Sequence, residues 1–324
     1  VYDLTKLGIM EYLSSGITAS FDMYIKNDFY AKANTDAGFR TVICSALNDF
    51  DADITNIERE YIKFNSYSEL VSYRLGIHAE YTTSMPRMEY MVSLAEKYKA
   101  PCYTHMSETK AEVDGCIERY GLTPPQLLDR IGFFRYGGGA FHCVWMDEAD
   151  IALMAEKKLY AVTCPGSNLK LASGVAPVDA FAAAGVPLAI GTDGAGSNNA
   201  LDMFREMYLV SALQKLKNMD AAAGSADRTL EMACAGGARA MGLDECDDIA
   251  PGKLADITVL DLERPNMQPV NNIARNIVYS GSKENVYLTM VNGKILYENG
   301  EFFLDESARD IYERCGEWKK RIVG

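Results

Sequence analysis

The chain contains three histidines, and each of them lies at the end of a short apolar run. His78 lies in GIHAEY, His105 in CYTHMSE and His142 in AFHCVW. A single histidine in such a place is as often a hydrogen-bonded core residue as a ligand, but three of three favour a common site. Neutral imidazole is the commonest metal ligand, and a carboxylate such as Asp193 is a usual companion around zinc or iron.

Two carboxylates add acid–base chemistry to these imidazoles. Asp193 lies in AIGTDGAGSNN, where small neighbours let the backbone turn sharply after an apolar run. An Asx turn that caps the next helix is the alternative for this residue. Glu108 lies three residues beyond His105, where it can exchange a proton with a metal-bound water. The alternative for Glu108 is a solvated glutamate in the first turn of a helix. We expect a hydrolase with His105 and Asp193 as metal ligands and Glu108 as its proton carrier.

Strand-like and helix-like patterns alternate along the first two thirds of the chain. Apolar residues at three-and-four spacing predict helices at 88–98, 148–157 and 178–184. This alternation is typical of parallel strands joined by crossover helices. Apolar, β-branched runs predict seven strands: 16–23, 40–47, 75–82, 101–105, 140–145, 159–163 and 186–192.

The polar residues discriminate between an open doubly wound sheet and a closed barrel. Chemically capable side chains follow several different strands, which suits a barrel because it gathers all its strand ends around one mouth, whereas an open sheet uses a switch point. These side chains are Asp22, His78, His105, His142 and Asp193. No Gly-x-Gly-x-x-Gly or Gly-x-x-x-x-Gly-Lys loop is present. We therefore predict an α/β fold, a (β/α)8 TIM barrel that lacks its first strand.

The pattern changes toward the end of the chain, after further helices expected at 202–216 and 229–241. Residues 253–262 and 286–303, with a turn at Asn292-Gly293, predict antiparallel strands. A last helix is expected at 308–321. We expect three parts, which are a metal-dependent hydrolase barrel truncated at its N-terminus (1–250), a β-sandwich portion (251–306) and a C-terminal helix (307–324).

The composition excludes several classes of protein. A net charge of −13 without a Lys/Arg-rich run disfavours binding to nucleic acid and to anionic membranes. No apolar stretch is long enough to span a bilayer, and no signal-peptide pattern begins the chain, so we expect a cytoplasmic protein. Eight cysteines without a Cys-x-x-Cys pair indicate buried free thiols rather than a thiolate zinc site.

Five ordered segments make the chain similar to the amidohydrolase superfamily. They are THMSET, AFHCVW, CPGSNLKLASGVAPV, AIGTDGAGSNN and PGKLADITVLD. The chain most resembles the branch that contains S-adenosylhomocysteine and methylthioadenosine deaminases, guanine deaminase and the triazine chlorohydrolases. The resemblance implies a (β/α)8 barrel with a small β-sandwich and one divalent metal, with zinc favoured over iron. It also implies metal ligation by His105 and Asp193, proton transfer by Glu108, contact of His142 with the hydrolytic water, and contact of His78 with substrate.

The family's His-x-His motif, which supplies two further metal ligands, is absent from this chain. This absence agrees with the missing strand, the incomplete sandwich and the lack of an initiator Met, and predicts that an N-terminal region has been lost. Two protein ligands are too few for a tight site. We therefore expect the chain on its own to be metal-depleted and inactive. A homodimer is an expectation from the family alone.

Glu108 narrows the expected chemistry. Ring deamination needs an acid beside a ring nitrogen, whereas amide hydrolysis in this superfamily often manages without that glutamate. We expect deamination of an aminopurine nucleoside of the adenosine, methylthioadenosine or S-adenosylhomocysteine type, with Asp193 accepting a proton as water attacks. Guanine deaminase or triazine chlorohydrolase activity is one alternative, and an inactive scaffold fragment is another.

Other polar residues carry weaker expectations. Ser167 and Asn168, in PGSNLKL, are expected to bind substrate, with helix capping as an equal alternative. Arg40 lies at the start of a predicted strand, away from the expected barrel mouth, and is expected to be structural.

Overall fold

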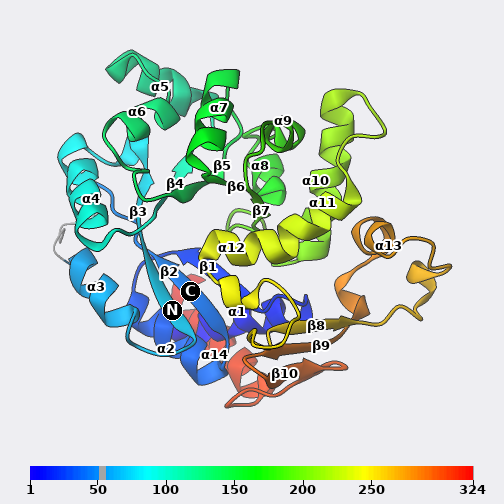
Figure 1. Ribbon diagram of the computed structural model, residues 1–324. Coiled ribbons are helices and arrows are strands. Elements are labelled where there is room, and N and C mark those ends of the chain that lie inside the picture. Colours follow the sequence, from blue (N-terminus) through cyan, green and yellow to red (C-terminus); the bar gives the residue numbers. More distant parts are fainter. Residues whose placement is uncertain (51–55, 324) are drawn as a thin grey trace.

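The computed structural model describes residues 1–50 and 56–323. Within them, a curled sheet of seven parallel strands runs in the order β1 to β7, so each strand pairs with its neighbours in the sequence. Figure 1 shows this sheet at the centre of the larger part of the molecule. The strands are β1 (Ala19–Met23), β2 (Arg40–Cys44), β3 (Val71–Ala79), β4 (Cys102–Met106), β5 (Gly138–His142), β6 (Tyr160–Thr163) and β7 (Leu188–Ile190).

Helices surround this sheet, and most of them follow a strand and cover its outer face (Figure 1). The helices have common N- and C-terminal caps. For example, α7 starts with a reciprocal capping box between Asp147 and Asp150, and α5 ends at Gly121, which has a left-handed conformation. Those around the sheet are α1 (Tyr2–Ser14), α2 (Asn27–Ala37), α3 (Asn56–Phe64), α4 (Met85–Tyr98), α5 (Lys110–Tyr120), α6 (Pro124–Arg130), α7 (Glu148–Lys157), α8 (Pro165–Lys170), α9 (Val178–Ala184), α10 (Met203–Asn218), α11 (Ala226–Glu231) and α12 (Gly237–Met241).

The main core lies between the strands and these helices. Leu75 and Ile77 of β3 pack in one apolar cluster with Met88 and Met91 of α4. All five residues of β2 are buried, as expected for a strand covered on both faces. At Gly138 the sheet has no room for a side chain, because an added Cβ would lie 1.8 Å from the carbonyl oxygen of Cys102. Gly138 therefore allows β5 to pack closely against β4.

A second sheet forms the C-terminal part of the chain. It is antiparallel, with strands in the order β11, β10, β9 and β8. Two threonines attach it to the end of α1: Thr258 donates to the carbonyl of Gly16, and Thr289 to that of Leu13, both at 2.7 Å. Its elements are β8 (Ile257–Leu260), α13 (Ile273–Ser280), β9 (Val286–Val291), β10 (Lys294–Glu298) and β11 (Glu301–Phe302).

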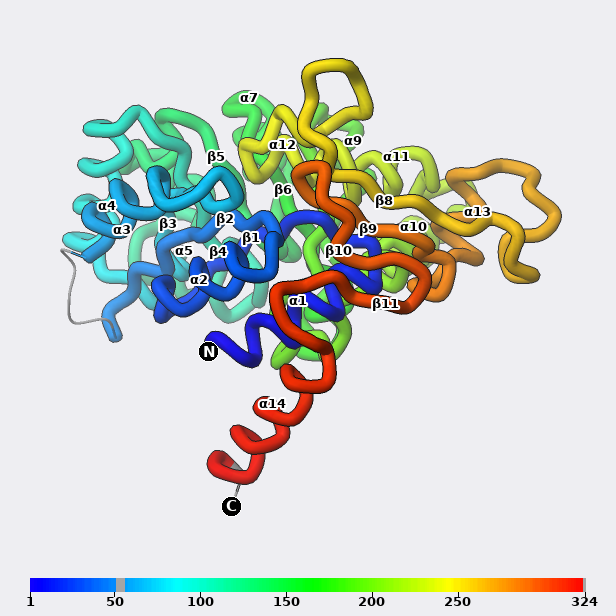
Figure 2. Tube along the Cα trace, turned by 90° about the horizontal axis from the view of Figure 1, so that it is seen from below, coloured from blue at the N-terminus to red at the C-terminus, as the bar shows by residue number. Residues whose placement is uncertain are grey.

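The last helix, α14 (Ala308–Val323), lies beside α1 and projects from the body of the molecule (Figure 2). Asp3 of α1 joins the two helices by accepting from Arg314 Nε at 2.7 Å and from Trp318 Nε1 at 2.8 Å. None of the described helices is long and apolar enough to cross a membrane.

The fold predicted from the sequence is confirmed: a seven-stranded parallel half-barrel precedes a small antiparallel sheet. Two details differ. The helix expected at 229–241 is interrupted by a π-helical turn at Met232–Gly236. The thiols are not all buried, since Cys234 on this turn is exposed, although five others are buried. The boundaries at 250 and 306 remain a proposal.

Candidate active site at the carboxyl ends of the parallel strands

The three histidines lie at the carboxyl ends of adjacent parallel strands. His78 is near the end of β3, His105 is in the last part of β4, and His142 is the last residue of β5. Because these strands are neighbours and run in the same direction, their ends meet on one side of the sheet. The ring centroids of His78 and His105 are 4.9 Å apart, and those of His105 and His142 are 5.4 Å apart. The structure thus brings together the histidines that the sequence singled out.

The orientation of His105 leaves one ring nitrogen free. Its Nδ1 lies 2.7 Å from the carbonyl oxygen of His78, which can only accept, so Nδ1 carries the proton and donates it. Nε2 is then the unprotonated nitrogen. Burial is the largest of the causes that lower the pKa of His105 to about 3, and the nearby His142 and His78 act in the same direction. His105 is therefore neutral at pH 7, which is the state that a metal ligand needs.

Asp193 lies three residues beyond β7, in a left-handed backbone conformation with φ of 58°. Ser167 Oγ donates to its Oδ2 at 2.5 Å, and the amide of Gly194 donates to its Oδ1 at 2.6 Å. The charge of Asp193 acts on both His105 and Asp22 and contributes to raising the pKa of the latter, for which burial is the larger cause. Asp193 therefore faces the same site as the histidines, with its carboxylate held by two donors.

His142 and Glu108 face each other across the site. His142 Nδ1 lies 2.8 Å from Asn168 Oδ1, and its Nε2 lies 3.8 Å from Glu108 Oε2. The other oxygen of Glu108 accepts from Ser173 Oγ at 3.1 Å. Trp145 braces that serine, because its ring nitrogen donates to the Ser173 carbonyl at 2.8 Å. The 3.8 Å separation is too long for a direct hydrogen bond, but it brings both groups close enough for a proton to pass through one bound atom between them.

Of the two expectations for Ser167 and Asn168, the structure decides against helix capping. Both lie within α8, whose first residue is Pro165, so neither caps the helix. Ser167 is fully buried and Asn168 is 2% exposed, and their side chains bind Asp193 and His142. In the described structure they hold two other site residues in place, and direct contact with substrate stays a prediction.

The two available ligands, His105 and Asp193, are of the types that bind a divalent metal, but they are fewer than a metal site needs. A neutral His105 with a free Nε2 and the carboxylate of Asp193 are the donors that zinc or iron takes. Among the described residues, however, no group of three or more His, Cys, Asp or Glu side chains is arranged to hold a metal ion. The two residues therefore fit as part of a metal site, whose remaining ligands would lie outside the described residues.

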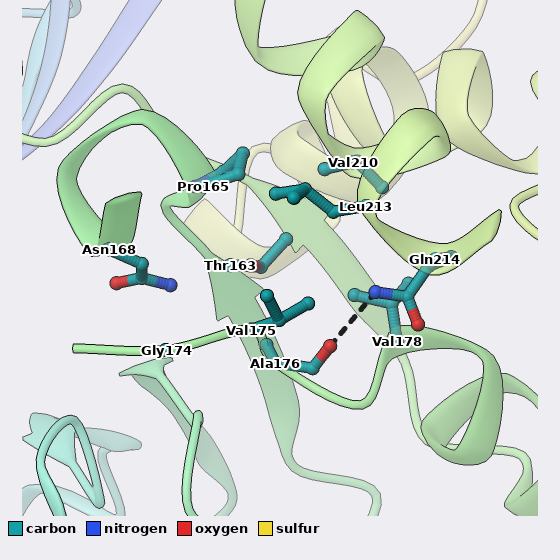
Figure 3. Close-up of a pocket in the computed structure, with 10 residues that line it drawn as sticks. All are labelled: Thr163, Pro165, Asn168, Gly174, Val175, Ala176, Val178, Val210, Leu213 and Gln214. Atoms are coloured by element: carbon teal, nitrogen blue, oxygen red, sulfur yellow. Dashed lines mark hydrogen bonds between the residues drawn. The ribbon is translucent and has the colours of Figure 1, made fainter. Parts of the chain in front are cut away.

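A small cavity lies beside α8, the helix that carries Asn168, between β6 and α10 (Figure 3). Its volume is about 10 Å³, room for about one water molecule. Gln214 spans one side of it and donates to the carbonyl of Ala176 at 2.9 Å. This cavity is too small for a nucleoside, and the candidate site is the histidine cluster instead.

Sequence reasoning missed Glu206, a fully buried carboxylate on α10. It accepts from the amide of Gly166 and from Asn198 Nδ2, each at 2.8 Å, and the same Asn198 nitrogen donates to the Thr192 carbonyl at 2.7 Å. Glu206 thus joins the α8 segment to the loop of Asp193. A signal was present, because Glu206 lies at the three-and-four spacing of buried residues such as Val210.

The pH dependence of stability should report on Glu206. Burial raises its pKa from 4.5 to about 7, so the folded state binds a proton more tightly than the unfolded chain does. Relative to Glu206→Gln, the wild-type protein should lose up to about 3 kcal/mol of stability as pH rises from about 4.5 to about 7. Urea unfolding at pH 5 and pH 8 measures this difference. Glu231→Gln, at an exposed position, is the control. Parallel pH curves for wild type and Glu206→Gln would contradict the assignment.

A half-barrel with imidazoles and carboxylates at its strand ends is the architecture of a metal-dependent (β/α)8 hydrolase. The sequence match agrees: the chain belongs to the amidohydrolase family, whose pattern matches residues 1–296. It is therefore a hydrolase that acts on carbon–nitrogen bonds.

The chain is also similar to individual members of this family. It is 37% identical to a 5-methylthioadenosine/S-adenosylhomocysteine deaminase from Pyrococcus furiosus, over 93% of this chain and 74% of that protein. It is 39% identical to a 5'-deoxyadenosine deaminase from Methanothermobacter thermautotrophicus, over 91% and 70%. The crystal structure of an adenosine deaminase from Xanthomonas campestris with bound zinc superposes with a TM-score of 0.94, at 33% identity over 99% of this chain and 75% of that one.

Proposed function

We propose that this site deaminates an aminopurine nucleoside of the adenosine, methylthioadenosine or S-adenosylhomocysteine type and releases ammonia. The observation that carries the proposal is the pair of Glu108 and His142, with Glu108 Oε2 at 3.8 Å from His142 Nε2 beside His105 and Asp193. Deamination replaces a ring amine by a carbonyl, so it needs a proton at a ring nitrogen and at the departing amine. The names of the relatives support this substrate class.

A divalent metal, zinc in preference to iron, would be held by His105 and Asp193 together with ligands outside the described residues. When bound, it would supply a hydroxide nucleophile near neutral pH. The zinc in the Xanthomonas campestris structure supports this part of the proposal.

The chain's own residues divide the proton transfers between them. Asp193 accepts the proton of the attacking water, and its two hydrogen-bond donors keep the carboxylate pointing into the site. Glu108 delivers a proton to the ring nitrogen and later to the leaving ammonia. His142, whose Nε2 faces Glu108, contacts and stabilises the tetrahedral oxygen.

The substrate contacts come from residues around this centre. His78 Nδ1 lies 2.9 Å from Thr82 Oγ1, and the charge of Glu108 acts on the His78 ring, so we assign His78 a contact with the substrate. Ser167 and Asn168 act in this proposal through Asp193 and His142. A small-molecule substrate, a homodimer and a cytoplasmic location complete the proposal.

The test is ammonia release, in one coupled assay, by purified, zinc-supplemented full-length protein that also carries the metal ligands outside the described residues. We expect at least tenfold higher kcat/KM with adenosine, methylthioadenosine or S-adenosylhomocysteine than with guanine. Higher activity with guanine, or chloride release from a chlorotriazine, would replace the proposal by one of its alternatives. No turnover of any substrate by protein shown to contain one zinc per chain would favour an inactive scaffold.

A further inference from the structure

Glu112, in the first turn of α5, bends back toward the segment that carries Glu108. Its Oε1 accepts from the amide of Ser107 at 2.7 Å, and its Oε2 accepts from the amide of Glu108 at 2.8 Å. Thr109 accepts from the amide of Glu112 at 3.2 Å and caps the helix. A usual capping box binds the amide of the capping residue. Here both carboxylate oxygens reach farther, to the two residues before it.

The burial of Glu112 exceeds what a helix cap requires. Its residue surface is 5% exposed, and it forms no ion pair with any described side chain. Burial raises the pKa of Glu112 to about 7, although the amides of Ser107, Glu108 and Thr109 act in the opposite direction. A buried carboxylate without a cation is costly. The two backbone amides that donate to its oxygens offset part of this cost.

The backbone that Glu112 binds is the turn between His105 and Glu108. Ser107 is a fully buried non-glycine residue with φ of 51°. Its amide is bound by Glu112, and its carbonyl accepts from the amides of Val144 at 3.1 Å and Trp145 at 2.8 Å. Strained backbone of this kind persists only where its surroundings fix it.

The Ser107 turn is bonded to a second turn, after β5, which carries His142. His142 and Cys143 have φ of 70° and 49°, and the amide of Cys143 donates to the Met106 carbonyl at 3.1 Å. The two turns, after β4 and after β5, are therefore joined through their backbones. Glu112 binds the amides of the first turn, whereas the second turn binds its carbonyls.

We propose that Glu112 is a positioning residue that acts through Glu108: it fixes the Ser107–Glu108 backbone so that the Glu108 carboxylate faces His142 Nε2. The expected loss of kcat rests on the proposed deamination. The expected change in the Ser107–Glu108 backbone does not, because it can be measured without turnover. The alternative is that Glu112 only caps α5 and contributes to stability.

A double-mutant cycle separates these two roles. Glu112→Gln keeps the size of the side chain but replaces one acceptor by a donor, which faces an amide that also donates. We expect it to lower kcat for adenosine-type substrates by 10- to 100-fold, with KM within about threefold of wild type. In a Glu108→Gln background the same change should cost less than about threefold, because its effect passes through Glu108.

Asp150 offers a matched control. It is a buried carboxylate in the capping box of α7, bonded to its own helix cap and to Thr123 at 2.6 Å. Asp150→Asn should reduce thermal stability as Glu112→Gln does and leave kcat within about threefold of wild type. An equal loss of kcat in both variants would show that capping alone explains the effect.

Hydrogen exchange provides the readout that does not depend on activity. In Glu112→Gln, the amides of Ser107 and Glu108 should exchange at least tenfold faster, measured by mass spectrometry on peptides that span residues 103–113. Unchanged exchange there, or an undiminished kinetic loss in the Glu108→Gln background, overturns the inference. If the wild-type protein releases no ammonia but the exchange increases as expected, the proposed function fails and the positioning role stands.

Discussion

Replacing Glu108 with Gln should lower the rate of deamination by about a thousandfold while leaving the fold intact. The amide keeps the shape of the side chain and can still accept from Ser173 Oγ, which now lies 3.1 Å from Oε1. It cannot carry a proton to a ring nitrogen or to leaving ammonia, and general acid catalysis contributes about 10²- to 10⁴-fold. Steady-state ammonia release gives the measurement.

The control for this variant is Glu118→Gln on α5, where the side chain is exposed and contacts nothing in the site. Zinc content and thermal unfolding should match wild type in both variants, since Glu108 is not one of the proposed metal ligands. Turnover that persists at the wild-type rate in Glu108→Gln would remove Glu108 from the mechanism.

The clustering of the histidines was predictable because it follows from topology alone. His78, His105 and His142 each end an apolar run, and a parallel sheet puts the carboxyl ends of its strands on one side. The ring separations of 4.9 and 5.4 Å are the consequence. No knowledge of side-chain packing was needed for this part of the site.

The bonds between the loops were not predictable in the same way. The pairing of Ser167 with Asp193, and of Asn168 with His142, joins residues that are 26 positions apart and follow or end different strands. Spacing along the sequence cannot indicate such a pair, because it depends on how each loop folds over its strand end. A polar residue there is compatible with capping, substrate contact or a hydrogen bond to a neighbour.

The buried glutamates were missed for a different reason. Glu112 occupies the first turn of a helix, where a glutamate is ordinarily solvated and interacts with the helix dipole. Its burial results from the turn at Ser107 folding over it, which is a tertiary event. The burial of Glu206 was easier to predict from the sequence, because Glu206 lies on the apolar face of a helix.

The largest effect on stability is expected from a buried ion pair between the half-barrel and the small sheet. Arg40, the first residue of β2, donates from Nε to Asp256 Oδ2 at 2.5 Å and from Nη2 to Oδ1 at 2.9 Å. The side chains of Arg40 and Asp256 are 4% and 1% exposed. Asp256 also accepts from the amide of Asn292 at 2.7 Å, in the turn between β9 and β10. The structural role expected for Arg40 agrees with this geometry.

Asp256→Ala should lower the free energy of unfolding by about 3–5 kcal/mol, because it leaves the Arg40 guanidinium buried without its counter-charge and the Asn292 amide without an acceptor. Urea unfolding measures the change. Glu313→Ala, which breaks the exposed pair with Arg309 on α14, should cost less than about 1 kcal/mol.

The double variant Arg40→Met/Asp256→Leu distinguishes the attraction within the pair from the cost of leaving one charge alone. It removes both buried charges while filling similar volume, so it should be more stable than Asp256→Ala by about 2 kcal/mol or more. A double variant as unstable as the single one would mean that the hydrogen bond to the Asn292 amide, and not the unpaired guanidinium, accounts for the loss. The attachment of the small sheet would then depend on Asp256 as an acceptor for the β9–β10 turn, with Arg40 serving chiefly to neutralise it.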